Sequence, residues 1–129
     1  MRVLVSCPPG YGDFHPLIPL ARACQAAGHE LAFASAESAR SQVERLGFEF
    51  FPAGGDWLGL LRERHPEVTI SPSADQMPLI DAAGFAGARI ELTLPPLLEV
   101  CKAWRPDVLV RDHLSFAGCL AAEELGIAH

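Results

Sequence analysis

The stretch that decides the fold is SCPPGYGDFHPLIPLARACQAAGHE, residues 6–30. It continues the apolar run RVLVS (residues 2–6), which is typical of a strand buried on both faces of a parallel sheet. Five apolar residues then recur at helical spacing: Leu17, Leu20, Ala21, Cys24 and Ala27. Gly28 is suited to end that helix. The turn between them, GYGDFHP at residues 10–16, places aspartate and histidine where a strand ends, and it is therefore the first candidate site.

The rest of the chain repeats this alternation of strand and helix patterns. Apolar runs predict further strands at 30–34, 48–52 and 107–111. Helical patterns cover 37–47, with Ser35 as the expected N-cap, 81–104 and 115–126. We expect Pro95 and Pro96 to interrupt the second of these helices. Residues 53–80, rich in proline and turn residues, predict a long connection with one short helix near 57–64.

This order predicts an α/β fold, a Rossmann-like doubly wound parallel sheet with its strands in the order three-two-one-four. Ligands bind such sheets at the carboxyl ends of the strands, where the strand order reverses. Asp13 and Asp112 follow the two strands that flank this point, so both should face one crevice. The closing IAH is typical of a new strand. We therefore expect residues 1–129 to be a partial domain, cut at its fifth strand, that can self-associate through the open sheet edge.

Composition and charge exclude several classes of function. Half of the residues are apolar, which indicates a globular chain. The 10 Lys and Arg residues are outnumbered by 16 Asp and Glu residues and form no basic stripe, so we expect no nucleic-acid partner. No apolar stretch approaches the roughly 20 residues of a membrane span. The cysteines have no paired spacing and predict thiols in a reducing cytoplasm: Cys7, Cys24, Cys101 and Cys119.

The residues of the turn alone leave three interpretations open. A dinucleotide-binding G-x-G-x-x-G motif is met by Gly10 and Gly12 but has His15 at its third position. A metal site could draw on Asp13, His15, Asp112 and His113, yet no known ligand spacing supports it, and we expect no metal or other cofactor. The third interpretation is a plain glycine turn with solvated polar residues, and His65 and His113 also fit solvated loops.

Three segments together carry a resemblance: MRVLVSCPPGYGDFHPLIPLARACQAAGHELAFAS (1–35), VERLGFEFFPAGG (43–55) and WRPDVLVRDHLSFAGCLAAEELGIAH (104–129). Their motifs agree in order and spacing with the N-terminal half of GT-B glycosyltransferases. The resemblance is to nucleotide-sugar-dependent enzymes of the antibiotic type, such as glycopeptide and macrolide glycosyltransferases. It implies an acceptor-binding domain of an inverting enzyme. An NDP-sugar would be the co-substrate, and the donor-binding C-terminal domain would be absent from this chain, leaving it inactive alone.

The same resemblance assigns roles to residues. The family's G-H-x-x-P turn, whose histidine is the general base, corresponds to Gly12–Pro16, where Asp13 replaces the histidine. Glycopeptide glycosyltransferases are similar in having G-D-x-x-P here. We therefore expect Asp13 to be the base, with Asp112 raising its pKa. Alternatively, Asp112 orients His15, and His15 is the base.

The remaining expectations concern binding. Phe14, Trp57 and Phe85 are expected to line the acceptor pocket, although Trp57 and Phe85 fit a structural core equally well. Gly10 and Gly12 are expected in a loop that faces the donor. A second function fits the same sequence: a non-catalytic binding subunit that works with a separate donor-binding chain.

Overall fold

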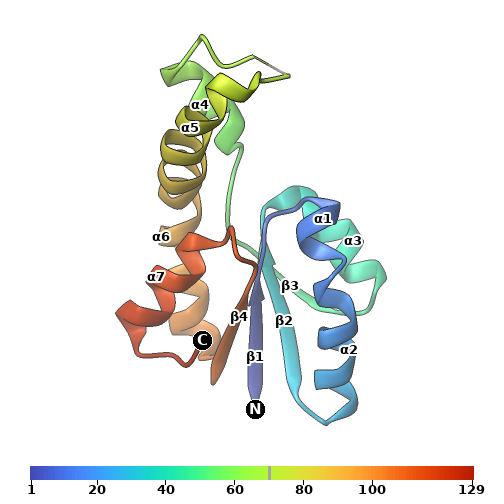
Figure 1. Cartoon of the computed structure of the whole chain (residues 1–129). Helices are drawn as coiled ribbons and strands as arrows, with labels where there is room; N and C mark the ends of the chain where they lie inside the picture. Colours follow the sequence, from blue (N-terminus) through green and yellow to red (C-terminus); the bar gives the residue numbers. More distant parts are fainter. Residues whose placement is uncertain (70) are drawn as a thin grey trace.

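Four parallel strands form the centre of the structure, a computed structural model that describes residues 1–69 and 71–129 (Figure 1). The strands are β1 (Arg2–Ser6), β2 (Glu30–Ser35), β3 (Glu49–Pro52) and β4 (Val108–Arg111). Their order is β3-β2-β1-β4, which confirms the predicted topology. Ile70, within the predicted 53–80 connection, lies outside the described residues.

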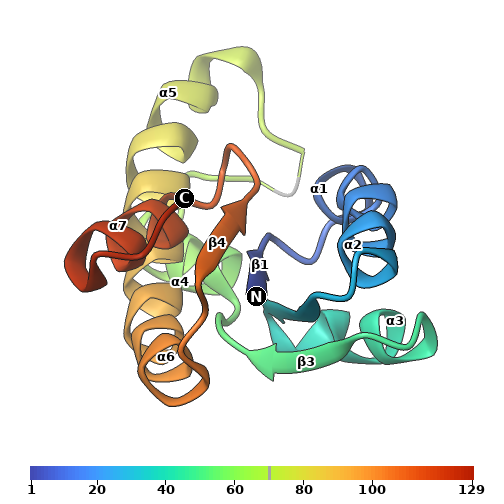
Figure 2. The same ribbon diagram turned by 90° about the horizontal axis from the view of Figure 1, so that it is seen from below.

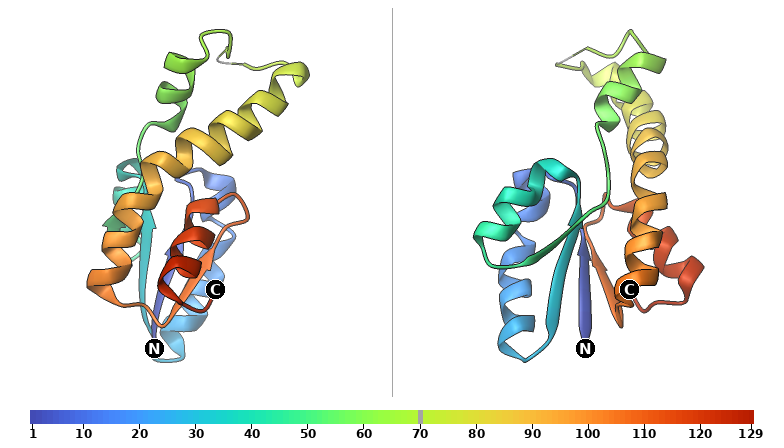
Figure 3. Two further views of the ribbon diagram at one scale, coloured as in Figure 1. Left: turned by 90° about the vertical axis from the view of Figure 1, so that its left-hand side faces the viewer. Right: turned by 180° about the vertical axis from the view of Figure 1, so that it is seen from behind.

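Helices cover both faces of the sheet (Figure 2). One face carries α1 (Tyr11–Phe14), α2 (Leu17–Ala26), the 3₁₀ turn η1 (Glu37–Ala39) and α3 (Arg40–Arg45). The other face carries α6 (Arg89–Trp104) and α7 (Phe116–Leu125). A third group stands beyond the carboxyl ends of the strands (Figure 3): α4 (Trp57–Arg64), η2 (Ala74–Gln76), α5 (Met77–Leu79) and the π-helix η3 (Ile80–Ala88).

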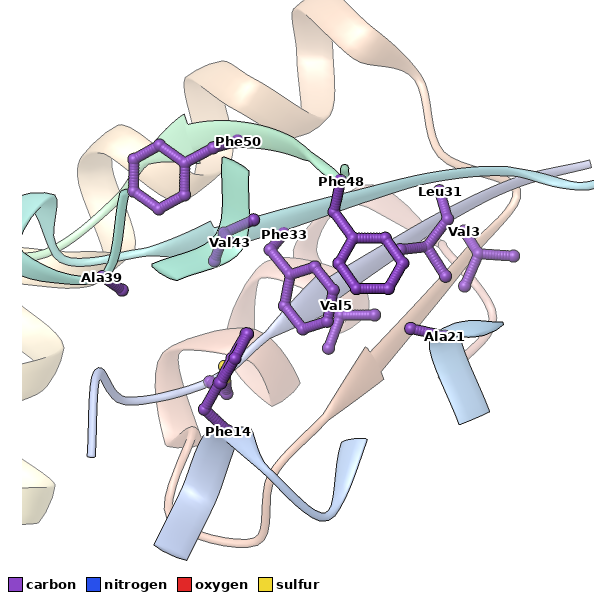
Figure 4. Packing of buried hydrophobic residues seen from close by; sticks show 11 residues of the cluster. Val3, Val5, Phe14, Ala21, Leu31, Phe33, Ala39, Val43, Phe48 and Phe50 are labelled. Carbon is purple, nitrogen blue, oxygen red and sulfur yellow. The ribbon is translucent and has the colours of Figure 1, made fainter. Parts of the chain in front are cut away.

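The two faces of the sheet bury different kinds of side chain. On the α1–α3 face, Phe33 packs between Phe14 and Phe48, with ring centroids 5.1 Å apart in each pair (Figure 4). On the other face the core is rich in small residues, which let α6 and α7 approach the strands closely. A Cβ atom at Gly118 of α7 would lie 3.2 Å from Leu109 Cδ2, so this helix packs tightly on β4.

Two sequence expectations about the helices are wrong. Ser35 is not an N-cap: it is the last residue of β2, and its Oγ donates a hydrogen bond to the Cys7 carbonyl at 2.7 Å. Pro95 and Pro96 do not interrupt α6, although neither has a backbone N–H to donate. Leu97, which follows them, is fully buried against the sheet, and this packing holds the helix together through the prolines.

The predicted helix 81–104 is two joined helices. Its first part is the π-helix η3, which has wider turns than an α-helix and leads into α6 at Arg89. The segment that widens is made mostly of alanine and glycine, which do not crowd such a turn. None of the helices among the described residues is long and apolar enough to cross a membrane.

The expected start of a fifth strand is visible at β4. Ala128 forms a parallel bridge with Val108, and its carbonyl accepts a hydrogen bond from the Leu109 N–H at 2.8 Å. The outer edge of β4 is therefore paired at this point rather than open along its whole length.

Leu97→Ala should destabilise the fold by about 2–5 kcal/mol, because the truncated side chain leaves a cavity beneath α6. Leu20→Ala is the matched control, since Leu20 is 46% exposed on α2, and it should change stability by less than about 0.5 kcal/mol. Urea unfolding followed by circular dichroism measures both. Equal losses in the two variants would contradict the placement of Leu97 in the core.

Candidate functional site

One cavity collects residues from the carboxyl ends of all four strands. Its empty volume is about 410 Å³, part of it open to solvent. The end of β1, the segments after the four strands and the start of α7 supply its floor: Ser6, Cys7, Pro8, Pro9, Ala36, Ala53, Gly54, Gly55, Ser115, Phe116 and Ala117. The helices above supply its roof: Trp57 from α4, Phe85 from η3, and Arg89, Ile90 and Thr93 from α6. The lining is mostly apolar, as expected of a small-molecule site.

Hydrogen bonds between strand ends hold the floor in place. Ser6 and Ser115 are buried and share a hydrogen bond between their Oγ atoms at 2.8 Å, which ties the end of β1 to the start of α7. The Asp112 N–H donates to the Ser6 carbonyl at 3.1 Å. Together with the bond from Ser35 to Cys7, these contacts fix the segments that follow β1, β2 and β4 against one another.

The roof is a stack of two rings and a guanidinium group. Trp57 and Phe85 have ring centroids 5.0 Å apart. The Arg89 guanidinium carbon lies 4.5 Å from the Trp57 centroid and 4.6 Å from that of Phe85. Gly84 permits this packing, because a Cβ there would lie 2.9 Å from Trp57 Cζ3. Both aromatic residues also pack on a small core of Leu61, Val68 and Ile80, so they line the cavity and stabilise the roof.

Asp13 and Asp112 form an electrostatic cluster beside the cavity. Burial raises the pKa of the Asp13 carboxyl, the negative charge of Asp112 raises it further, and Arg89 and His113 oppose the shift. Burial and the same two carboxylates raise the pKa of the Cys7 thiol to about 12. Cys7 and Arg89 both line the cavity. The charges of Asp13 and Asp112, called the acid pair below, therefore influence two residues of the cavity wall.

Sequence reasoning missed Arg89. Its pKa is lowered by burial, whereas Asp13 and Asp112 oppose that shift. A signal was present in the sequence. Arg89 directly follows AAGFAGA at 82–88, a run of apolar and small residues, and a buried charge in such surroundings needs a partner.

The structure does not bring His15 to the cavity. His15 is exposed, packs edge-on against Tyr11 at 4.9 Å, and lines a separate surface hollow with Ile18 and Gln42. Asp112 is engaged elsewhere: its Oδ1 accepts a hydrogen bond from the Leu114 N–H at 2.8 Å, and its Oδ2 lies 3.2 Å from His113 Nδ1. In the described part of the chain, the alternative pairing of Asp112 with His15 is not formed.

Phe14 does not line the cavity, contrary to the expectation that it belongs to the acceptor pocket. Its side chain is 1% exposed and packs on Phe33, so it cannot contact a ligand in the cavity. The reason is the short helix α1, in which adjacent residues point in different directions, so that Asp13 is half-exposed while Phe14 enters the core.

The two glycines of the turn differ in their surroundings. A Cβ at Gly10 would lie 2.7 Å from Asp13 Oδ2, so the absent side chain makes room for that carboxylate. A Cβ at Gly12 would meet nothing within 4 Å. Their expected position facing a donor stays a prediction.

The candidate metal ligands do not form a metal site in the described part of the chain. Within residues 1–69 and 71–129, no three His, Cys, Asp or Glu side chains gather as they would around a metal ion. The four cysteines are free thiols, with Cys7 and Cys101 buried.

Several curated proteins resemble the sequence over its whole length, although no family model matches it. The chain is 24% identical to tylactone mycaminosyltransferase of Streptomyces fradiae and 28% identical to 10-deoxymethynolide desosaminyltransferase of Streptomyces venezuelae, each over 148 aligned positions covering 100% of this chain. It is 30% identical to 4'-demethylrebeccamycin synthase of Lentzea aerocolonigenes over 98% of its length. The chain spans about a third of these relatives, covering 33%, 35% and 30% of them.

Solved structures share the fold. The glycosyltransferase SsfS6 of Streptomyces sp. SF2575 superposes with a TM-score of 0.80 at 29% identity, over 98% of this chain and 37% of that protein. The glycosyltransferase SnogD of Streptomyces nogalater gives a TM-score of 0.77 at 27% identity, over 98% of this chain and 32% of SnogD. Both likenesses cover the N-terminal part of GT-B glycosyltransferases.

Substitutions in the charge cluster should move the pKa of Asp13 in opposite directions. Asp112→Asn removes a repulsive charge and should lower it, whereas Arg89→Met removes an attractive charge and should raise it. Carboxyl-detected NMR titration of the 129-residue chain measures both shifts. Shifts of the same sign would contradict the described cluster.

Gly10→Ala should displace the Asp13 carboxyl group and change its pKa, because the new methyl group occupies the space of Oδ2. Gly12→Ala is the matched control and should leave that pKa unchanged. Both variants should remain folded, since only the end of a side chain must move. The same NMR titration provides the measurement, and an unchanged Asp13 pKa in Gly10→Ala would show that the close contact is not maintained in solution.

Proposed function

We propose that this chain, whose relatives are antibiotic glycosyltransferases and whose fold is that of the N-terminal part of GT-B enzymes, binds the acceptor in an inverting glycosyl transfer. The observation that carries the proposal is an apolar cavity with an acid pair beside it, at the carboxyl ends of the strands. The reaction joins a hydroxyl oxygen of a natural-product aglycone to the anomeric carbon of a nucleotide-activated sugar.

Asp13 is the proposed general base. As the hydroxyl oxygen forms its bond to the anomeric carbon, an ionised Asp13 oxygen takes the hydroxyl proton. The bond from that carbon to the nucleoside diphosphate breaks, and the diphosphate leaves with the electron pair. Attack from the face opposite to the leaving group inverts the anomeric centre. Base catalysis of this kind contributes about 10²–10⁴ in rate.

The environment of Asp13 supports this role. An ordinary carboxylate is a weak base, with a pKa near 4. Burial and the charge of Asp112 raise the pKa of Asp13, which strengthens it as a proton acceptor. Asp112 is held by the Leu114 N–H and His113, and among the described residues it has no hydrogen bond with His15, which leaves it available as the charged neighbour of Asp13.

The relatives support the substrate classes. Their names describe transfer of sugars to tylactone and 10-deoxymethynolide, and the solved VinC and SsfS6 glycosyltransferases were each crystallised with thymidine diphosphate. We propose a thymidine-diphosphate sugar as the donor and a largely apolar aglycone as the acceptor.

The donor's diphosphate is proposed to bind outside these 129 residues. Arg89 is the one cation among the described residues that line the cavity, and the charges of Asp13 and Asp112 already act on it. The enzyme therefore needs a donor-binding half, fused or separate. The proposal gives this chain no metal, because the Arg89 guanidinium supplies the counter-charge of the acid pair.

In the enzyme assembled with its donor-binding half, Asp13→Asn should lower kcat at least about a hundredfold and leave acceptor binding nearly intact. His15→Gln, at the exposed position, should change kcat much less. Thymidine diphosphate release gives the rate, and calorimetry gives acceptor affinity. The opposite ranking would move the base to His15. Acceptor binding without turnover in the unmodified assembly would instead favour the non-catalytic binding subunit.

The pH profile should report the Asp13 ionisation. Since the base must be ionised, kcat should fall as pH falls through the raised pKa of Asp13. Asp112→Asn should shift this acidic limb to lower pH, because it removes one cause of the raised pKa. An acidic limb that does not move in Asp112→Asn would separate Asp112 from the catalytic base.

A further inference from the structure

Arg89 lines the cavity and carries a buried hydrogen-bond donor that has no partner among the described residues. Its guanidinium lies against the rings of Trp57 and Phe85, within cation–π distance of both. Its Nη1 atom is buried and has no hydrogen-bond partner among the residues that the structure describes. Most buried polar groups in proteins are hydrogen-bonded, so such an unpaired donor calls for an explanation.

The guanidinium remains charged at neutral pH. Arginine keeps its proton in proteins, and Asp13 and Asp112 oppose the effect of burial on Arg89. The acid pair therefore accounts for its charge, but it does not supply an acceptor for Nη1. A bound molecule with an oxygen lone pair would supply that acceptor.

We propose that Arg89 is a specificity-determining residue of the acceptor cavity, whose Nη1 donates a hydrogen bond to an uncharged carbonyl oxygen on a flat ring of the acceptor. This proposal rests on the function proposed above and narrows its acceptor class. The flat ring fits because a guanidinium stacks on aromatic planes, and Trp57 and Phe85 hold this one in place.

The local charges favour a neutral carbonyl over a carboxylate. The charges of two carboxylates, Asp13 and Asp112, already act on a single guanidinium, while His113 is exposed to solvent. A carboxylate ligand would add a third negative charge beside Asp13. A carbonyl oxygen accepts the hydrogen bond without that repulsion.

The test uses three probes of one shape: acetophenone, its hydrocarbon analogue isopropylbenzene, and benzoate. The chain contains two tryptophans, so their indole N–H signals give an internal comparison in NMR titrations of the 129-residue chain. Trp57 lines the cavity, whereas Trp104 lies at the end of α6 and packs on Phe51. Probe binding should move the Trp57 signal and leave that of Trp104 in place.

The unmodified chain should bind acetophenone about tenfold more tightly than isopropylbenzene, as expected for one hydrogen bond to a charged donor. Benzoate should bind more weakly than acetophenone. Arg89→Met, which keeps an apolar chain of similar length, should make the first two affinities equal within about twofold. Arg64→Met is the matched control, since Arg64 pairs with Glu91 away from the cavity lining, and it should preserve the tenfold preference.

Each other outcome overturns a defined part of the proposal. If Arg89→Met keeps the preference for acetophenone, or if benzoate binds best, the role of Arg89 is wrong while the acceptor cavity stands. If no probe moves the Trp57 signal in the folded, unmodified chain, the cavity does not take aromatic molecules, and the proposed function loses its main support. Should Arg89→Met fail to fold, Arg89→Gln removes the charge with an amide in its place and should also lower the preference.

Discussion

The parallel pairing of β1 between β2 and β4 is the constraint on which the rest of the structure depends. Val3, Leu4 and Val5 are almost fully buried, and they alternate between the two cores. Because β1 is paired on both edges, the segments after β1 and β4 emerge side by side, with Ser6 opposite Arg111 in the register. The position of Asp13 relative to Asp112 follows first from this pairing, and the hydrogen bond from the Asp112 N–H to the Ser6 carbonyl holds the two segments together.

Much of this arrangement was predictable. Apolar runs such as RVLVS identify buried strands, and the handedness of strand connections leaves few possible orders, so the sheet edge that carries the acid pair followed from pattern alone. The directions in which single side chains point could not be predicted from the pattern. Phe14 and Asp13 are neighbours in a four-residue helix, and only the packed core decides which one turns inward. Arg89 was missed because Trp57, Asp13 and Asp112 are distant from it in the sequence, and their approach depends on tertiary contacts.

The environment that raises the pKa of Asp13, as the proposed function requires, also lowers the stability of the fold at neutral pH. The folded state raises the pKa of Asp13, so its contribution to stability is fully present below the ordinary pKa of an aspartate and is lost as pH rises through the raised value. An ionised Asp13 at neutral pH therefore costs folding energy, and the Arg89 guanidinium offsets part of that cost. The same arginine links this balance to the cavity wall, since it is the charged residue that α6 places beneath the two aromatic rings.

The roof has a hydrophobic core of its own, in which Leu61, Val68 and Ile80 are buried apart from the two cores of the sheet. It joins the sheet domain through the connection at residues 53–56 and through α6 (Figure 1). Such a segment can change its sequence without disturbing the packing of β1, provided that Trp57 and Phe85, which hold Arg89 near the acid pair, are kept. Exchange of the other roof residues among related chains would therefore vary the shape of the cavity above the ends of the strands. Diversification by exchange of the roof needs no compensating change in the strands.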